Sequence, residues 1–337
     1  DTLDRVVAIK YNNTVLYTYT YDGSGRLFSA CDIYSNRTYY YTYDLNGSII
    51  GTREVYTGTG AEIIRTENTY DSFGRTASIS YIYGGSTYTY TFGYDEESST
   101  LTSVGLPTGT TLNYEYDSYD RLESKEIKTA DGTSVYKESY EYLIKDGKYI
   151  TDYISSIQYG NSDSDKEYYT YDDVGNILTI KVGTELKLSY VYDDAFQLIR
   201  ENNKYANKTY VYEYDRYGNI TSKKTYAYTT GTLGTVTNTV TYTYGDENWC
   251  DLLTNYNGTT INYDVTGNPL NWHNAEDIEW FETAGKQISI LCQSGEGVYM
   301  YEYNFDGIRT KKTLYQYDAV TLIYTRCYLQ WNILLLP

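Results

Sequence analysis

Residues 19–27 read Tyr-Thr-Tyr-Asp-Gly-Ser-Gly-Arg-Leu, and close copies of this nonapeptide return at 41–49, 169–177 and 212–220. The common pattern is Y-x-Y-D-x-x-G-(R/N)-(L/I). An aspartate followed three residues later by glycine favours a type I turn, because its carboxylate can accept a backbone N–H and glycine adopts positive φ at low cost. The residues before the aspartate alternate with a period of two, which is typical of a strand. The pattern therefore predicts a strand that ends in a tight turn.

The pattern continues along the whole chain in weaker copies. The tyrosine before the aspartate recurs at 21, 43, 70, 94, 116, 171, 192, 214, 244, 263 and 303, and Tyr142 and Phe281 take this place in the weakest copies. A second turn is indicated near the middle of several repeats, where dipeptides suited to two-residue hairpins occur. These are Asn12-Asn13, Gly84-Gly85, Asp131-Gly132 and Asn257-Gly258.

Each repeat is thus predicted to be a β-hairpin, and consecutive hairpins to form one continuous antiparallel sheet. We expect an all-β protein in which residues 1–337 are a single array of about 14 degenerate repeats, with tyrosines in ladders along the sheet. The residues expected to define the repeats structurally are Tyr21, Asp22, Gly25, Arg26, Tyr43, Asp44, Gly47, Tyr70, Asp71, Gly74, Arg75, Tyr116, Asp117, Tyr171, Asp172, Gly175, Asn176, Tyr214, Asp215, Gly218, Asn219, Tyr263, Asp264, Gly267, Gly307 and Arg309.

Composition agrees with this prediction and excludes several functions. Tyrosine contributes 48 of the 337 residues and proline only 3. The net charge of −18 disfavours a nucleic-acid-binding surface, since a polyanion repels phosphate backbones. The four cysteines lie far apart without a C-x-x-C pair, and no apolar stretch of about 20 residues predicts a membrane span. We expect no cofactor and no metal.

Both ends are expected to be truncated. Residues 1–6 (Asp-Thr-Leu-Asp-Arg-Val) reproduce the turn sequence at 117–122, so the chain is expected to begin inside a repeat. The C-terminal end is an apolar, strand-like run at 322–333. An array cut in this way is expected to be an open sheet whose terminal strands carry unpaired backbone groups.

The tandem tyrosine–aspartate core resembles the signature of the Rhs/YD-repeat family over nearly the whole chain. Residues 280–288 look like the tryptophan-containing G-R-Q-L segment of that family, and residues 301–310 look like its D-G-I-R-T segment. The resemblance implies a sheet wound in a spiral into a hollow shell. In bacterial members such a shell encloses a C-terminal toxin, and insect-toxin complexes and animal teneurins build similar shells. The family's self-cleavage region carries D-P-x-G, and this sequence contains no Asp-Pro dipeptide.

Catalytic and metal-binding candidates are few. His273 is the only histidine and has no serine beside it, so a Ser-His-Asp arrangement is not expected. Asn161, Asp163, Asp165 and Glu167 alternate and could offer oxygens to Ca²⁺, but the segment lacks the central glycine of an EF-hand loop and is expected to be solvated. The repeated aspartates are periodic, as turns require and a paired-carboxylate site does not.

The tyrosine rows allow two functional interpretations. Aromatic rings flanked by Asp and Asn can bind sugars, but a tyrosine at the same place in every repeat is better explained by structure. We therefore expect a non-enzymatic structural segment of a secreted or surface-exposed bacterial protein, whose partners are the remaining shell repeats and an enclosed C-terminal domain of the same polypeptide. The alternative is a cell-surface adhesion module whose tyrosine-rich face binds carbohydrate.

Overall fold

The computed structural model describes residues 1–11, 13–33, 35–160, 162–273, 275–280, 288–293, 297–303, 309–318 and 321–329. Within these ranges the protein is all-β and contains no α-helix. Its only helical element there is a single 3₁₀ turn, η1, at Asp163–Asp165. Among the described residues, no helix has the length and hydropathy that crossing a membrane would require.

The chain divides into two compact units, Asp1–Tyr210 with Tyr226–Gly234 and Val211–Thr225 with Thr235–Pro337. The strands of the first unit are β1 (Ala8–Tyr11), β2 (Thr14–Tyr21), β3 (Leu27–Asp32), β4 (Arg37–Tyr43), β5 (Ile49–Tyr56), β6 (Glu62–Tyr70), β7 (Thr76–Tyr83), β8 (Ser86–Tyr94), β9 (Leu101–Gly105), β10 (Thr111–Tyr116), β11 (Leu122–Lys128), β12 (Ser134–Lys145), β13 (Tyr149–Tyr159), β14 (Lys166–Tyr171), β15 (Ile177–Val182), β16 (Glu185–Tyr192) and β17 (Leu198–Asn203).

Two further strands, β18 (Lys208–Tyr214) and β19 (Ile220–Ala227), contain the points where the chain passes between the units. The remaining strands belong to the second unit: β20 (Asn238–Thr243), β21 (Asn255–Tyr256), β22 (Thr259–Thr260), β23 (Ala275–Trp280), β24 (Ile288–Gln293), β25 (Gly297–Tyr303), β26 (Arg309–Asp318) and β27 (Thr321–Leu329). The last five form a separate antiparallel sheet, each strand paired with the next.

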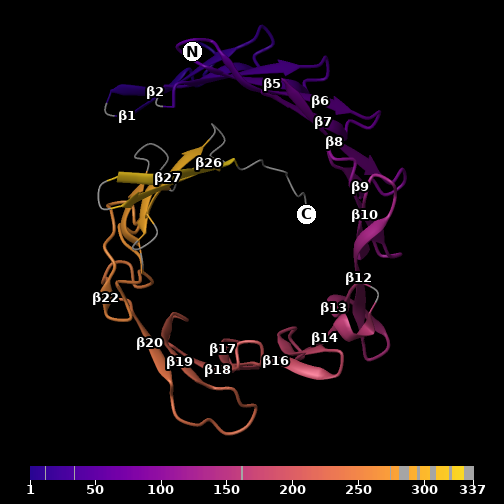
Figure 1. Cartoon of the computed structure of the whole chain (residues 1–337), viewed down its shortest axis with the longest axis vertical. Helices are drawn as coiled ribbons and strands as arrows, with labels where there is room; N and C mark the ends of the chain where they lie inside the picture. The colour runs from indigo at the N-terminus through magenta and orange to yellow at the C-terminus, as the bar shows by residue number, and fades with distance from the viewer. Residues whose placement is uncertain are drawn as a thin grey trace. The chain divides into compact units, whose positions relative to one another are not determined.

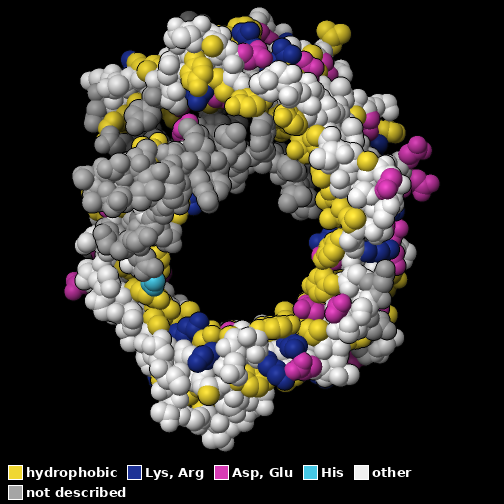
Figure 2. Space-filling model, in the orientation of Figure 1, with side chains coloured by type: hydrophobic (Ala, Val, Ile, Leu, Met, Phe, Trp, Pro, Cys, Tyr) yellow, Lys and Arg dark blue, Asp and Glu magenta, His cyan; other side chains and the backbone are white. Residues whose placement is uncertain are grey.

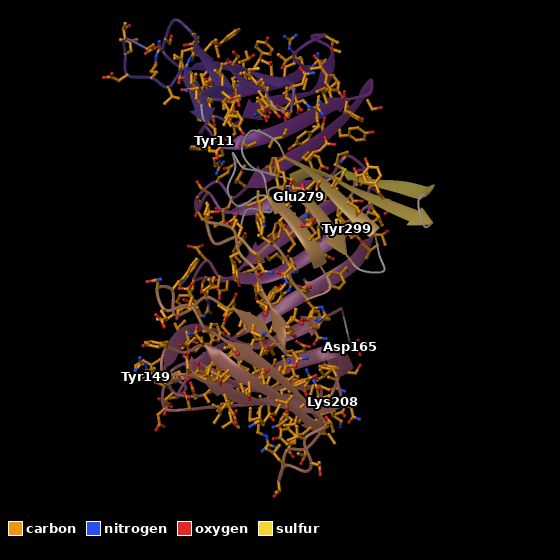
Figure 3. The ribbon with its side chains drawn as sticks, turned by 90° about the vertical axis from the view of Figure 1, so that its left-hand side faces the viewer. Tyr11, Tyr149, Asp165, Lys208, Glu279 and Tyr299 are labelled. Carbon is orange, nitrogen blue, oxygen red and sulfur yellow. The ribbon has the colours of Figure 1, made fainter. Side chains whose placement is uncertain are left out.

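In the first unit every strand pairs antiparallel with its neighbour in the chain, so the hairpins follow one another along the sheet as the sequence predicts (Figure 1). A long strand such as β13 crosses the sheet from Tyr149 at one edge to the turn that holds Asp165 at the other (Figure 3). The turns therefore lie in two rows, one at each end of the strands.

Two of the four predicted mid-repeat turns have the expected geometry. Gly84 and Gly85 both have positive φ and join Tyr83 to Ser86, and Asn257 and Gly258 do the same between β21 and β22. The Asp131-Gly132 turn is longer, because Lys128 pairs with Ser134 and the loop between them has five residues. Of the Asn12-Asn13 pair, Asn12 lies outside the described residues.

The first unit has few large buried side chains. Apart from Tyr226, its buried residues are small or polar, among them Ala30, Val55, Ser124, Ser156 and Thr209. Figure 2 shows hydrophobic side chains on the concave side of the sheet over β9 and β10, with Asp and Glu side chains projecting from its other side. The second unit has a small apolar cluster in its five-stranded sheet, formed by Tyr299, Tyr301 and Leu314. Stability in the first unit therefore rests on hydrogen bonds and tyrosine contacts that repeat along the sheet.

Candidate functional site: the clasp between consecutive repeats

The aspartate of each full repeat organises the turn that follows it. In the turn of residues 22–26, the Asp22 carboxylate Oδ1 accepts the backbone N–H groups of Ser24 and Arg26, each at 2.9 Å. The Gly25 N–H donates to the Asp22 carbonyl at 2.9 Å, and Gly25 has a φ of +83°. Asp44, Asp71, Asp172, Asp215 and Asp264 accept the same two backbone N–H groups in their own turns.

The left-handed position of the turn is not always glycine. Asp4 and Asp120 occupy it with φ of 56° and 59°, which agrees with the predicted equivalence of residues 1–6 and 117–122. Phe196 (φ 62°) also takes this position, and Ser99 (φ 62°) is left-handed in the turn after Asp95, which is one residue longer. A left-handed conformation costs a residue with a side chain about 1–2 kcal/mol, so the hydrogen bonds of these turns offset local strain.

The tyrosine before the aspartate reaches back to the preceding repeat. The Tyr43 hydroxyl donates to the backbone carbonyl of Leu27, the residue that follows the first repeat's turn, at 2.7 Å. The equivalent bonds run from Tyr21 to Val6, Tyr70 to Ile49, Tyr94 to Thr76, Tyr116 to Leu101, Tyr142 to Leu122, Tyr171 to Ile154, Tyr192 to Ile177, Tyr244 to Ile220 and Tyr263 to Leu253, at 2.6–3.2 Å.

A β-bulge positions these tyrosines. The register shifts by one residue immediately before Tyr21, Tyr43, Tyr70 and Tyr94, and the same shift occurs at Tyr116, Tyr171, Tyr192 and Tyr303. A bulge increases the local twist and redirects a side chain. We infer that this shift helps to direct the phenol hydroxyl to the carbonyl of the neighbouring hairpin.

Where the residue after the turn glycine is arginine, it completes the contact between repeats. Arg75 Nε donates to the Asp71 carboxylate at 2.7 Å, and Arg75 Nη1 donates to the carbonyl of Asp95 in the next repeat at 3.0 Å. Its guanidinium lies 4.6 Å from the centre of the Tyr94 ring. Arg26 spans Asp22, Tyr43 and the Asp44 carbonyl in the same way. We call this set, with the tyrosine–carbonyl bond, the repeat clasp.

The clasp varies along the chain. Arg121 contacts Asp117 and lies 4.1 Å from the Tyr142 ring, but its Nη1 donates to Thr151, which lies farther along the chain. Asn176, Asn219 and Asn268 replace the arginine and bond the aspartate of their own turn at 2.8–3.1 Å. Asn219 also donates to the Asp251 carboxylate at 3.0 Å.

The electrostatics follow from these bonds. The backbone N–H of Arg26 and then its guanidinium lower the pKa of Asp22, and the backbone N–H of Asn268 lowers the pKa of Asp264. Burial raises the pKa of the Tyr43 phenol, and the Asp22 carboxylate adds to that rise. Tyr43 therefore stays a protonated donor, and Asp22 and Asp264 stay charged acceptors, at neutral pH.

The structure brings most of the predicted repeat residues together in these clasps. Gly307 lies outside the described residues, as do 281–287 and 304–308 from the two family-like segments. Arg309 lies 5.5 Å from the Tyr301 ring. Gly47 and Gly218 have the left-handed φ of the turn. The Ser48 that follows Gly47 donates its backbone N–H to the Asp44 carboxylate, and its carbonyl accepts the Asp44 N–H.

Sequence reasoning missed the tyrosine–carbonyl bonds. It expected contacts between rings, and such contacts exist: Tyr153 stacks on Tyr171 at 5.1 Å, and Tyr81 meets Tyr90 edge to face at 5.9 Å. The bond that recurs in nearly every repeat is nevertheless made by the hydroxyl. In several repeats, such as the first, the Leu or Ile that follows the turn marks the carbonyl that receives the bond.

Of the other sequence candidates, the structure describes the side chains of His273, Asp165 and Glu167. His273 packs its ring 5.7 Å from that of Tyr256. Asp165 lies in η1, while Asn161 and the side chain of Asp163 lie outside the described residues. Within the described part of the chain, no three His, Cys, Asp or Glu side chains cluster as a metal site would require.

Comparison with known proteins finds a match in fold and none in sequence. No family model and no curated protein matches the chain. The chain is similar to the crystal structure of TcdB2-TccC3-TEV over 94% of its length, with 15% identity and a TM-score of 0.52. It is similar to that of TcdB2-TccC3 over 93%, with 15% identity and a TM-score of 0.50. The chain has the fold of an Rhs/YD-repeat shell segment.

The resemblance drawn from the repeats is thereby confirmed at the level of the fold. The chain spans about a fifth of the length of the two matched chains.

Proposed function

We propose that this chain is a non-enzymatic stretch of wall in a shell that encloses a C-terminal toxin or effector domain of the same polypeptide. The observation that carries the proposal is the repeat clasp within an Rhs/YD-repeat shell fold. Each clasp bonds a repeat to the one before it, as in Tyr43 to Leu27 and Tyr70 to Ile49, and so joins hairpins into one extended sheet. A wall needs this kind of continuity.

The charged side chains of the clasps form hydrogen bonds within the turns and between repeats. This supports a structural role without catalysis. The carboxylates of Asp22 and Asp71 hold their own turns, and the guanidinium groups of Arg26 and Arg75 each bridge to the next repeat. On this proposal the partners are the other shell repeats and the enclosed domain. The parent polypeptide would be secreted by a bacterium or displayed on its surface.

Limited proteolysis of the parent polypeptide tests enclosure. The full chain and its isolated C-terminal domain are digested in parallel, and we expect the domain to survive much longer in the full chain. Equal rates of digestion would refute enclosure. A double variant tests whether the clasps are needed for this protection. Tyr43→Phe with Tyr70→Phe should speed digestion of the C-terminal domain in the full chain. Tyr205→Phe, at an exposed tyrosine outside the clasps, should not.

The reading frame of the parent provides a second test. We expect a D-P-x-G region and then a separate domain downstream of the repeats. A cell-wall anchor in their place would support the adhesion alternative and reject the shell.

A further inference from the structure

The second repeat lacks a side-chain pair that several other repeats have. The middle residue of Y-x-Y-D bonds across to the next strand: Thr20 to Ser29 at 2.6 Å, Thr69 to Ser78 at 2.7 Å, Glu115 to Ser124 at 2.6 Å and Glu213 to Ser222 at 2.7 Å. In the second repeat, Thr42 lies opposite Gly51. The position that holds a serine elsewhere is empty of any side chain here.

This glycine is not required by the backbone. Gly51 is absent from the residues with positive φ, so a residue with a side chain could adopt its conformation. A Cβ at Gly51 would lie 3.1 Å from the Thr66 carbonyl oxygen and 4.0 Å from the Thr42 Cβ. The contact with the carbonyl oxygen is close, so a side chain here would require the Thr66 carbonyl to shift slightly. Gly51 also lines the sheet surface between β4, β5 and β6.

An open pocket of about 540 Å³ occupies this surface. Its lining includes Phe28, Tyr40, Thr42, Arg53, Arg65 and Glu67. The rings of Phe28 and Tyr40 meet edge to face at 5.8 Å, and Phe28 is 48% exposed. One wall of the pocket is thus aromatic and open to solvent.

The other wall carries two arginines in direct register. Arg53 of β5 lies opposite Arg65 of β6, and like charges placed this way destabilise a sheet. Arg65 has carboxylates nearby, Glu67 at 3.4 Å and Glu62 at 3.8 Å. The contact of Arg53 is with the Tyr40 ring at 5.0 Å, and no carboxylate of the described residues pairs with it.

We propose that this pocket binds an acidic saccharide through a uronate unit. The sugar carboxylate would lie between Arg53 and Arg65, because a planar guanidinium fork suits a carboxylate. The sugar ring would pack on Tyr40, and the Thr42 hydroxyl and Glu67 carboxylate would bond to sugar hydroxyls. A pocket of about 540 Å³ has room for a disaccharide. The proposal does not depend on whether the chain encloses a domain.

Titration calorimetry of the whole chain with digalacturonate, galactobiose and acetate tests the site. Digalacturonate has both sugar rings and carboxylates. Galactobiose has the sugar rings without the charge, and acetate has the carboxylate without a ring. We expect saturable binding of digalacturonate, at least about tenfold tighter than either control and weakened by salt. No binding of digalacturonate, or binding no tighter than that of galactobiose or acetate, would overturn the proposal.

Variants locate the binding. Gly51→Ser introduces the serine found at this position in other repeats and should reduce digalacturonate binding at least about tenfold per folded molecule. Its melting temperature is measured as well, because its Cβ would lie 3.1 Å from the Thr66 carbonyl oxygen. Arg53→Gln should weaken binding by a similar factor. Arg216→Gln makes the same charge change at an exposed arginine whose contacts are with Tyr217, and it should leave binding intact. Unchanged binding in Gly51→Ser and Arg53→Gln would place the saccharide elsewhere and reject this site.

Discussion

The hydroxyl of Tyr43 donates to the backbone carbonyl of Leu27 across 2.7 Å. Leu27 follows the turn of one repeat, and Tyr43 precedes the turn of the next. The bond therefore joins two hairpins through a backbone group that any residue at position 27 would provide. The same bond can therefore form in repeats whose sequences differ widely, as they do in this degenerate array.

Removing one such hydroxyl should cost stability. Tyr43→Phe keeps the ring beneath Arg26 but leaves the Leu27 carbonyl without the tyrosine donor, and we expect a loss of about 1 kcal/mol. The measurement is the urea midpoint of the whole chain. Tyr205→Phe, at a tyrosine that is 62% exposed, is the control and should change the midpoint little. Equal effects in the two variants would mean that the bond contributes nothing.

The turn glycine should resist a branched side chain. Gly74 has a φ of +81°, and a Cβ at this position would meet no atom within 4 Å. The cost of Gly74→Val is therefore conformational and should be about 1–2 kcal/mol. Ser72→Val, at an exposed position of the same turn, should cost less than about 0.5 kcal/mol. The urea midpoints of the two variants check this, and a Gly74→Val variant as stable as Ser72→Val would show that the left-handed conformation does not matter.

The converse change should stabilise the protein. Phe196 holds the left-handed position with a φ of 62° and is 60% exposed, so Phe196→Gly relieves strain at a small loss of packing. We expect a gain of about 0.5 kcal/mol, since the flexibility of glycine offsets part of the relief. Phe73→Gly makes the same substitution where φ is not positive and should destabilise. Thermal melting that ranks the two variants in the opposite order would contradict this account.

The clasp arginine should not be replaceable by lysine. Arg75 contacts Asp71, the Asp95 carbonyl and the Tyr94 ring at once, and only a planar fork can make all three contacts. We expect Arg75→Lys to lower stability by about 1 kcal/mol in urea unfolding. Arg216→Lys, on the exposed surface, is the matched control. No difference between the two would show that charge alone is sufficient at residue 75.

Acid should weaken the turns. The pKa of Asp22 is lowered in the folded protein, first by the backbone N–H of Arg26 and also by its guanidinium. A lowered pKa means that the contribution of Asp22 is complete above the unfolded pKa of about 4 and is lost as pH falls toward the folded value. We expect the melting temperature to be flat from about pH 5 to pH 7 and to fall below about pH 4.

A charge-neutral variant separates this effect from general acid sensitivity. Asp22→Asn should be less stable than wild type at pH 7, and the gap should narrow below about pH 4, where the wild-type carboxylate is protonated. Asp194→Asn, at an exposed aspartate, should give a curve parallel to that of wild type. If the difference in stability between Asp22→Asn and wild type stays constant as pH falls, protonation of Asp22 does not cause the loss of stability in acid.

The sequence was sufficient to predict the strands and the D-x-x-G turns because both are local. A period of two before Asp22 and a glycine at 25 specify a strand and a left-handed turn without reference to the rest of the chain. Even Asp4 and Asp120 could be placed in the left-handed position by comparing two hexapeptides.

The clasp was harder to predict because it depends on register between strands. The Tyr43 hydroxyl reaches Leu27 across neighbouring hairpins whose register shifts by one residue at Thr42/Tyr43, and no local pattern reveals that shift. The Gly51 pocket was missed for the same reason: only the pairing of Gly51 with Thr42 shows that a serine is absent there.

The direction of the tyrosine bond has a consequence for synthesis. Each described clasp tyrosine donates to a carbonyl earlier in the chain, as Tyr70 does to Ile49 and Tyr94 to Thr76. During translation the acceptor carbonyl is therefore always synthesised before the donor hydroxyl. Each new hairpin can bond to a hairpin that has already left the ribosome. We expect nascent chains stalled at successive lengths to gain protease resistance in repeat-sized steps from the N-terminal end. Resistance that arises only on release would mean that the array folds all at once.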